Sequence, residues 1–505
     1  MGLIDRLRGF FTRNGAYDGG GWDRRNRNWS PVDGSGERVN QMSRDVLRLR
    51  ARDLERNSDN VAALVDAFER NVVGTGMRLQ AKVTADNGEE DETVNQQIEA
   101  LWNGWCRYES CDVTGQFCFS EMQRMAVRRR LVDGGLFFVL CIDGSFEKEH
   151  SFSKSGSIPL RLQMKEVDEL DTSVADFQGR PVVAGVELDR FGRAVAYHFK
   201  GYDRYGFPTG NSVRLPAENV IYLSWKTRPS EVRELTPLAK IITRLRDLNQ
   251  FVEAVSVKER VLACLSVFVK KINPGGFGRA GRPGERESVY RSKTLTPGMI
   301  TELDAGDSID VVNPSGQASN AREFVTMMLR SIGAALGISY EAASRDMSQV
   351  NYSSARQGLL DDQKTYRMWQ EYLIEHFCKR IYREFLRVCV LTGALVLPDF
   401  FGNEEKYCKC TFIPNGQSWI DPQKEVNANV AALASCQTTL EEICAETGKD
   451  YREVIRQRAK ELALMRECGI AAAGAEGAAG ESQATENEED ESEEQQEETG
   501  TGNFE

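Results

Sequence analysis

The sequence predicts an α+β fold in which two long helices flank a small basic insertion. Three observations support this prediction. An apolar stripe runs from Leu238 to Val255 at helical spacing, and a second helix is indicated from Asn320 to Leu336. Between them, residues 265–317 change to β-type runs, Gly-rich turns and a concentration of positive charge. A β-rich region precedes this unit, and one very long helix follows it.

The N-terminal region is predicted to be a loose arm followed by helices. Residues 1–42 are rich in Gly, Arg and Asn, and Trp22 and Trp29 in this arm would dock either on a neighbouring subunit or on their own domain. Ser43 is a candidate N-cap for the first helix. That helix carries a basic stripe of arginines four positions apart, at Arg44, Arg48, Arg52 and Arg56. Further helices are expected over 61–73, 92–107 and 120–132.

Strand patterns replace helical ones after Asp133. A β-type apolar run covers 136–142, and residues 158–167 alternate between apolar and polar. The runs 182–188 and 194–199 flank the turn sequence DRFG at 189–192, which predicts a hairpin. A last strand over 219–225 closes the β-rich region.

The long helices have recognisable ends. Thr236 caps the first, and Pro237 at the first helical position costs no hydrogen bond, so a helix should continue to about Cys264. Gly337 stops the second. Strands are expected in the insertion over 265–272, 299–303 and 308–312. A very long helix should run from Ser353 or Ser354 to Thr392, and residues 421–469 form a small helical unit.

Net charge is unevenly distributed along the chain. The chain has 505 residues with 76 acidic and 64 basic side chains, a formal charge of -12. Residues 471–505 contain twelve acidic side chains and no Lys or Arg, so removing them leaves 64 acidic against 64 basic residues. The acidic balance therefore belongs to a tail predicted to be disordered, and it does not argue against a nucleic-acid partner.

No catalytic, metal or membrane motif stands out. The chain lacks the phosphate-binding loop, HExxH, GxSxG and GxGxxG patterns, and its three histidines are isolated. The twelve cysteines include no CxxC pair; they are read as reduced thiols, with a zinc site from distant cysteines as the less favoured alternative. Cys408 and Cys410 would share a strand face. The adjacent pairs Asp361-Asp362 and Glu404-Glu405 are read as solvated charges. We expect no enzyme activity, cofactor, metal or membrane span.

Several separate motifs, in order, resemble the lambda-like portal family of tailed bacteriophages. They are RARDLERN at 50–57, NVVGTGMRLQ at 71–80, the hairpin residues of 185–197, GISYE at 337–341 with NYSSAR at 351–356, and WIDPQKE at 419–425. The resemblance spans about residues 43–470.

The resemblance implies a fold made of named parts. After a flexible arm at 1–42, it places a wing at 43–233, helical and then β-rich, stem helices at 234–264 and 318–337, and a clip at 265–317. It then places a tunnel loop at 338–354, a long wing helix and return at 355–417, a crown at 418–470, and the acidic tail at 471–505.

The resemblance also implies a function. The subunits would form a ring, usually a dodecamer, at one vertex of the capsid, through which double-stranded DNA is packaged and ejected. Partners would be the terminase, head-completion or connector proteins and the major capsid protein. The location would be the virion, and the host cytoplasm during assembly. The alternatives are a nucleic-acid-processing enzyme and a minor capsid or scaffold protein that forms no closed ring.

Two sets of candidate residues follow. The tunnel-loop set that would face DNA is Arg345, Asp346, Gln349 and Asn351, and the other reading is a solvated polar loop. The clip set that would dock a partner is Lys270, Lys271, Arg279, Arg282 and Arg286, in a stretch with seven basic and two acidic residues from Lys270 to Lys293. The other readings are cations that face DNA at the channel mouth and a plain surface. The acidic tail would repel DNA from the inner rim, or serve only solubility.

Overall fold

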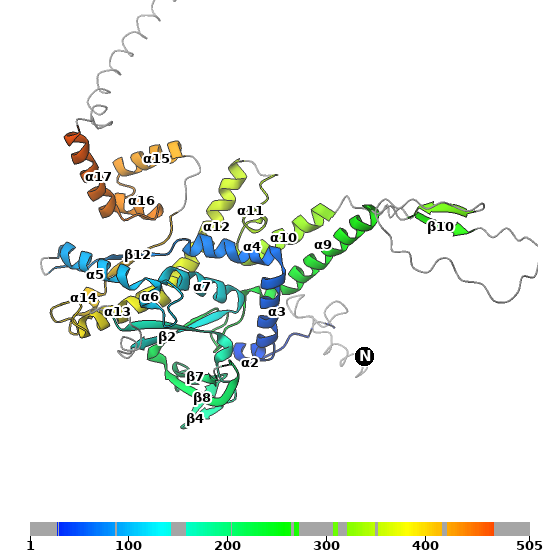
Figure 1. Ribbon diagram of the computed structural model, residues 1–505, viewed down its shortest axis with the longest axis horizontal. Coiled ribbons are helices and arrows are strands. Elements are labelled where there is room, and N and C mark those ends of the chain that lie inside the picture. The colour runs from blue at the N-terminus through cyan, green and yellow to red at the C-terminus, as the bar shows by residue number, and fades with distance from the viewer. Residues whose placement is uncertain are drawn as a thin grey trace, which may run out of the picture. The chain divides into compact units, whose positions relative to one another are not determined.

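A computed structural model describes Asn28 and residues 30–85, 88–142, 158–203, 205–263, 267–271, 307–311, 321–348, 352–416 and 422–468. The chain forms two compact units, Met1–Gly76 with Ala81–Cys410, and Met77–Gln80 with Thr411–Glu505. Both helices and strands are present, as the mixed fold class predicts (Figure 1). Within the described ranges, no helix combines the length and apolar character needed to cross a bilayer.

The first unit begins with a series of helices. They are α2 (Gly36–Gln41), α3 (Arg44–Asn57), α4 (Asp59–Phe68), α5 (Glu92–Trp105), α6 (Tyr108–Cys111) and α7 (Phe119–Val132), with a π-turn, η2 (Glu69–Val73), continuing α4. Of these, α3, α4, α5 and α7 start within two residues of the predicted positions. Ser43 stands at the N-cap of α3 as predicted, but its side chain makes no capping hydrogen bond. The capping interaction inferred for Ser43 is therefore wrong, although the helix start is right.

Two antiparallel sheets form the β-rich region. One has the order β3-β2-β9 and the other the order β4-β5-β6-β7-β8. The strands are β2 (Gly135–Ile142), β3 (Leu160–Lys165), β4 (Asp176–Phe177), β5 (Arg180–Val183), β6 (Val186–Leu188), β7 (Ala194–Tyr202), β8 (Pro208–Pro216) and β9 (Val220–Ser224). The hairpin at 189–192 is confirmed. The run 182–188 is not one strand, because Ala184 and Gly185 adopt positive φ and turn the chain between β5 and β6.

Strand β2 is buried on both faces because it packs against different partners on each side. Phe137 stacks on Tyr222 at 4.3 Å between ring centroids and joins the core formed with Tyr197 and Phe199 of the second sheet. Phe138 faces the helices and lies 4.4 Å from Phe377. The β-rich region and the helical layer therefore share one central strand.

The helical layer is built around aromatic rings. Trp102 of α5 lies 5.1 Å from Phe385 in an edge-on arrangement, and Phe119 of α7 stacks on Phe377 at 5.5 Å. Such ring pairs add to the free energy gained from apolar burial. These ring pairs join α5 and α7 to the long interrupted helix that spans residues 352–391, although these segments are more than 250 residues apart in the sequence.

The long helices are interrupted where the sequence suggested continuous ones. Thr236 accepts a hydrogen bond from Leu238 N as predicted, but the first turn is the 3-10 helix η5 (Pro237–Lys240), and α9 (Ile242–Ala263) follows it. The predicted helix over 353–392 is α12 (Tyr352–Leu373), a π-turn η7 (Ile374–Cys378) and α13 (Lys379–Leu391). A π-turn shifts the apolar stripe without ending the helix, so the periodic pattern continues through it.

Between the long helices lies a two-stranded antiparallel ladder. β10 (Val267–Lys271) pairs with β11 (Asp307–Val311), and α10 (Ala321–Leu336) follows. Two strands of the predicted insertion are thus confirmed, and the strand expected over 299–303 lies outside the described residues. α9 and α10 contact each other through Phe251 and Phe324, whose rings are 4.5 Å apart.

The second unit is described by itself. β1 (Arg78–Ala81) pairs with β12 (Cys410–Ile413), and three helices follow: α15 (Pro422–Ala434), α16 (Leu440–Glu446) and α17 (Tyr451–Glu467). The helical unit expected over 421–469 is therefore present. Cys408 and Cys410 do not share a strand, because Cys408 caps the short helix α14 (Glu404–Tyr407) and only Cys410 belongs to β12.

Candidate functional site

The junction after α10 is a sharp turn held by one glycine. Gly337 has φ +78°, and a Cβ at this position would lie 2.9 Å from Thr365 Oγ1. Thr365 of α12 uses that hydroxyl to donate to the Gly337 carbonyl at 2.6 Å. Glycine is therefore required at this position for two reasons: the backbone is left-handed, and α12 approaches closely. The turn redirects the chain from α10 into the short helix α11 (Tyr340–Ser344).

Ser339 connects this turn to the long helix. Its hydroxyl oxygen accepts from Ala342 N and so caps α11, while the same hydroxyl donates to Asp362 Oδ2 at 2.6 Å. Ser339 N also donates to Asp362 Oδ1 at 2.6 Å. Burial raises the pKa of Asp362, although the two hydrogen bonds from Ser339 oppose the shift. Asp362 was predicted to be a solvated charge. That prediction is wrong, because its side chain faces α11, whereas the exposed Asp361 pairs with Lys364.

The segment after α11 is a polar loop with defined internal bonds. Arg345 takes the left-handed conformation at φ +58° and donates its backbone N–H to the Glu341 carbonyl at 2.8 Å. Asp346 accepts from Tyr340 Oη at 3.1 Å and from Ser348 N at 3.0 Å. These hydrogen bonds, led by the Ser348 side chain and backbone, lower the pKa of Asp346. Arg322 of α10 donates to Ser348 Oγ at 3.2 Å.

The two described tunnel-loop candidates therefore have different surroundings. The Arg345 side chain is exposed, and within the described ranges no carboxylate forms an ion pair with it. Asp346 is half-buried and organises the turn, a role that the sequence did not indicate. Gln349 and Asn351, the other two candidates, lie outside the described residues.

The basic insertion is described only at its base. Lys270 and Lys271 stand at consecutive positions of β10, opposite Ser308 and Asp307 of β11. Arg279, Arg282 and Arg286 lie outside the described residues.

Most arginine side chains of the α3 stripe are buried or half-buried in the protein. Arg44 is buried and donates to Glu37 Oε1 at 2.6 Å, and Arg52 makes paired hydrogen bonds with Asp133 and Asp168. Arg48 is buried beside Asp168 and Glu234. The four-residue spacing was visible in the sequence, but apart from Asp45 the acidic partners lie 7 to 186 residues away, so their proximity could not be seen. Of the stripe, only Arg56 is exposed.

The ion-pair cluster continues to the residues just before η5 and α9. Arg233 makes paired hydrogen bonds with Glu234 and donates to the Val167 carbonyl at 2.9 Å. Burial opposes ionisation of Glu234, but Arg233 outweighs burial and lowers the pKa of Glu234. Tyr222 Oη donates to Glu234 as well. The cluster thus ties α2, α3, the 3-10 turn Val167–Glu169 and β9 to the residues that immediately precede η5.

A second buried carboxylate organises the five-stranded sheet. Glu187 accepts from Arg214 Nε at 2.7 Å and from Arg180 Nη1 at 3.0 Å, and His198 Nε2 lies 3.4 Å away. Hydrogen bonds from Arg214 and Arg180 outweigh burial and lower the pKa of Glu187 to about 2. His198 is therefore a packing residue, as inferred from its isolation. His376 contacts Tyr372, and His150 lies outside the described residues.

Arg130 occupies an aromatic cage that sequence patterns did not suggest. Its guanidinium carbon lies 3.6 Å from the ring centroid of Tyr372, 4.4 Å from that of Trp369 and 4.9 Å from that of Trp225. Burial lowers the pKa of Arg130 to about 10. The contacts fasten α7 to α12, and they leave no room for a ligand cation on these ring faces.

The described ranges contain no candidate metal centre. No group of three or more His, Cys, Asp or Glu side chains there could hold a metal ion. The described cysteines are free thiols, and burial raises the pKa of Cys111 and Cys378 to about 12, which makes them unreactive.

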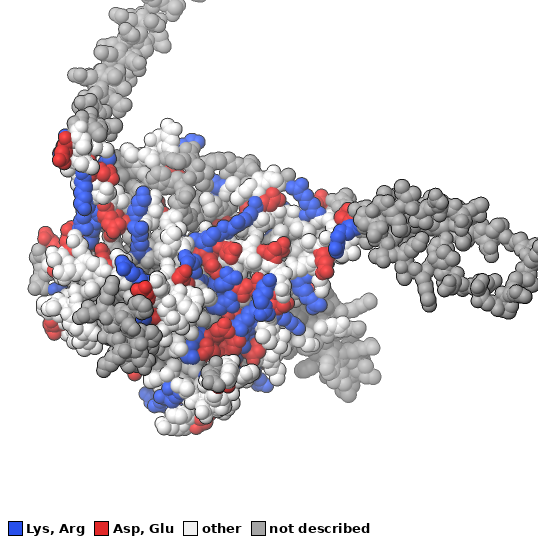
Figure 2. Space-filling view, in the orientation of Figure 1, with Lys and Arg blue, Asp and Glu red and all other residues white. Residues whose placement is uncertain are grey.

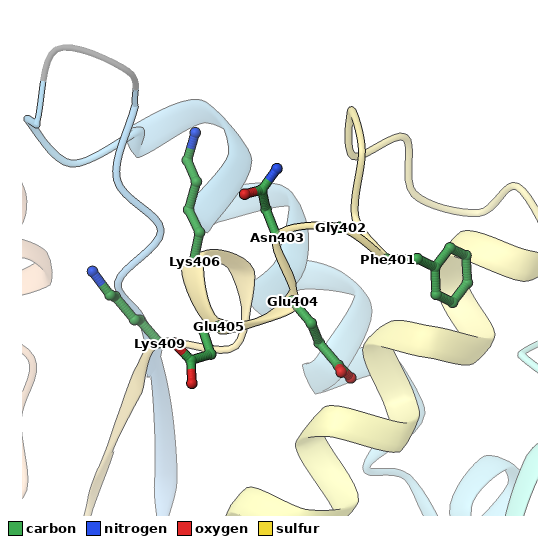
Figure 3. A pocket seen from close by; sticks show the side chains of 7 residues that line it. All are labelled: Phe401, Gly402, Asn403, Glu404, Glu405, Lys406 and Lys409. Atoms are coloured by element: carbon green, nitrogen blue, oxygen red, sulfur yellow. The ribbon is translucent and has the colours of Figure 1, made fainter.

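A hollow of about 470 Å³ lies on the surface of the 401–409 turn (Figure 3). Its lining includes the exposed Glu405 and Lys409 and also Glu404, whose carboxylate pairs with Arg387. Glu404 and Glu405 diverge as predicted, and Glu404 is not a free solvated charge.

Positive and negative side chains are interleaved on the face shown in Figure 2, and neither sign dominates it. This matches the equal numbers of acidic and basic residues outside the C-terminal tail. A family model for phage portal proteins of the lambda family matches residues 22–370, which include both long helices, the basic insertion and the loop after α11.

The chain belongs to the lambda family of phage portal proteins.

Individual portal proteins support the assignment. The chain is 23% identical to a probable portal protein of Halomonas phage phiHAP-1 over 88% of this chain and 86% of the relative. It is also 23% identical to portal protein B of Escherichia phage lambda over 90% of each chain. Among solved structures, a chain in the virion of a native gene transfer agent particle is similar, with a TM-score of 0.39 and 12% identity over 76% of this chain and 98% of that one.

Proposed function

We propose that this portal protein is the subunit of a closed ring, a dodecamer by family analogy, that conducts double-stranded DNA through one vertex of a phage capsid. The single observation that supports it most is the family match, which spans residues 22–370. DNA would pass inward during packaging and outward during ejection. The ring would act as a conduit without an enzymatic step.

The proposed parts follow the described elements. The wing would comprise 43–233, the stem would comprise 234–264 and 318–337, and the clip would be 265–317. The tunnel loop would lie within 338–354, the long wing helix and return within 355–417, and the crown within 418–470. α9 and α10 are side by side at Phe251 and Phe324, as two stem helices must be.

A DNA conduit needs weak and non-specific contacts. Each phosphate that a protein neutralises releases counterions and adds to affinity, so a strongly basic channel would hold DNA in place. Outside the C-terminal tail, the chain has equal numbers of acidic and basic residues, and this neutral balance would let DNA slide through the channel. We assign Arg345 as a phosphate-facing side chain of the tunnel loop because it is exposed and unpaired within the described ranges, while Asp346 shapes the turn. Gln349 and Asn351 would complete the loop.

The clip would serve docking. We propose that Arg279, Arg282 and Arg286, with Lys270 or Lys271, form a basic surface for the terminase during packaging and for head-completion proteins afterwards. Support comes from the stretch between Lys270 and Lys293, in which seven basic residues outnumber two acidic ones. The wing would contact the major capsid protein, which places the protein in the virion and, during assembly, in the host cytoplasm.

Electron microscopy of the purified full-length chain tests the proposal. Closed rings with a central opening are expected, together with loss of DNA packaging in phage that lack the protein. Monomers under every assembly condition would contradict a portal ring and favour a minor capsid or scaffold protein. Metal-dependent DNA cleavage that disappears with one carboxylate substitution would instead support a nucleic-acid-processing enzyme.

A further inference from the structure

Helices α15 and α17 expose six apolar side chains. On α15, Val426, Val430 and Leu433 are 42%, 60% and 37% exposed. Their spacing of four and then three residues places them along one side of the helix. On α17, Val454, Ile455 and Leu464 are 36%, 49% and 60% exposed. We call these six residues the C-terminal apolar set.

This helical segment has almost no core of its own. Among residues 422–468, Cys444 is the one described side chain that is buried. α15 has 13 residues and α16 has seven. Helices of this length are marginal in water and take their stability from packing an apolar face. A single buried thiol cannot supply that packing, so the C-terminal apolar set needs a partner.

The acidic tail is not a suitable cover. Residues 469–505 contain only two large apolar side chains, Ile470 and Phe504, among many Glu, Gly and Ala residues. Covering six apolar side chains requires apolar area on the other side, because the free energy gained is proportional to the apolar surface removed from water.

Charge favours a second copy of the same chain. α16 carries three acidic side chains, Glu441, Glu442 and Glu446, and no basic one. α17 carries five basic side chains and three acidic ones. The acidic helix of one subunit is therefore complementary to the basic helix of another. Both helices also lie beside members of the apolar set, and charged groups around an apolar centre are the usual anatomy of an interface.

We propose that the α15 stripe of one subunit packs against the α17 apolar side chains of the next, with α16 facing basic α17. The two contact surfaces differ, so the association is head-to-tail and repeats around a ring. This inference rests on the proposed ring and adds to it a named contact: the 422–468 segment acquires its core only when neighbouring subunits assemble.

Photo-crosslinking tests the contact directly. The full-length chain carries p-benzoylphenylalanine at position 430 and is assembled from an equal mixture of ¹⁴N-labelled and ¹⁵N-labelled subunits. Irradiation should give mixed-isotope crosslinks to α17 peptides, read by mass spectrometry. Crosslinks confined to one isotope would show that another segment of the same chain, such as residues 1–27, covers the stripe, and would overturn the proposal. A failure to crosslink any protein would overturn it too, because the stripe would then face solvent.

A matched pair of variants provides a second test. Val430→Asp places a charge within the stripe, whereas Ala428→Asp places the same charge at an exposed position on the opposite side of α15. V430D should weaken subunit association at least about tenfold relative to A428D, measured by native mass spectrometry across a dilution series. Equal association of the two variants would overturn the contact. If the unmodified chain forms no ring, the proposed function fails; if it forms rings and V430D matches A428D, only this inference fails.

Discussion

Ser339 donates both its backbone N–H and its hydroxyl to the Asp362 carboxylate, each over 2.6 Å, across 23 residues of sequence. This pair joins the start of α11 to the long helix α12. Since Arg345 is the C-cap of α11, six residues after its N-cap Ser339, the position of the proposed DNA-facing arginine depends on the Ser339–Asp362 pair. The same hydroxyl caps α11, so the loss of either partner should loosen the loop.

The first prediction concerns the pH dependence of this pair. Burial raises the pKa of Asp362 above its value in the unfolded chain, so the native state binds its proton more readily. Stability should therefore rise relative to Asp362→Asn as pH falls from 7 through the raised pKa toward about 3.9, the usual value for Asp. Thermal melts at a series of pH values measure the difference. Asp361→Asn removes an exposed neighbouring charge and should follow the native chain. Parallel curves for D362N and the native chain would contradict the prediction.

The second prediction concerns the tunnel loop. Deletion of residues 346–349 should leave rings intact and reduce the DNA retained per particle, because the proposed contacts with DNA are lost. Arg345→Ala should show part of the defect, and Arg345→Lys should restore it, since a phosphate contact needs a cation. Nuclease-protected genome copies per particle give the readout. Unchanged genome content in the deletion would remove the loop from the channel.

The third prediction concerns the basic insertion. Replacing Arg279, Arg282 and Arg286 together with Ala should preserve ring formation and impair packaging by several-fold, because a basic docking surface is lost. Pull-down of the terminase and packaged DNA per particle measure the two effects. Normal packaging and binding by the triple variant would show that the docking surface lies elsewhere.

The fourth prediction separates two arginines of the α3 stripe. Arg52→Ala leaves the buried Asp133 and the half-buried Asp168 without their paired hydrogen bonds and should cost about 3 kcal/mol of unfolding free energy. Arg56→Ala, at an exposed position of the same helix, should cost less than about 1 kcal/mol. Denaturant titration of both variants provides the comparison. If Arg52→Ala cost no more unfolding free energy than Arg56→Ala, the ion-pair cluster would contribute little to stability.

The fifth prediction concerns Glu187. Its pKa is lowered to about 2, so its stabilising contribution is present above the unfolded value of about 4.3 and is lost as pH falls toward 2. Glu187→Gln should therefore be less stable than the native chain at pH 7, and the gap should narrow below about pH 4.3. Melting temperatures across this range test the prediction. A gap that stays constant with pH would show that Arg180 and Arg214 do not depend on the Glu187 charge.

Sequence by itself determined the order of the parts. Local patterns were enough to place the hairpin turn at 189–192, the stop at Gly337 and the strands on either side of the basic insertion, because turn chemistry and periodicity act over a few residues. Ordered motifs were likewise enough to indicate the portal family. The interruptions at Ile241 and at η7 were missed, since one 3-10 turn or π-turn barely changes an apolar pattern.

Only the tertiary structure decided which charges are buried and what they hold together. Arg44, Arg48 and Arg52 look like a surface stripe in sequence, yet they meet carboxylates from α2, the end of α7 and the β-rich region. Asp361 and Asp362 look equivalent, yet one is exposed and the other binds Ser339. Burial of an ionised group depends on partners that are distant along the chain, because desolvation must be offset by charges brought close only in the folded state. Sequence patterns show which residues carry a charge, but they do not show which distant charges offset the desolvation of a buried one.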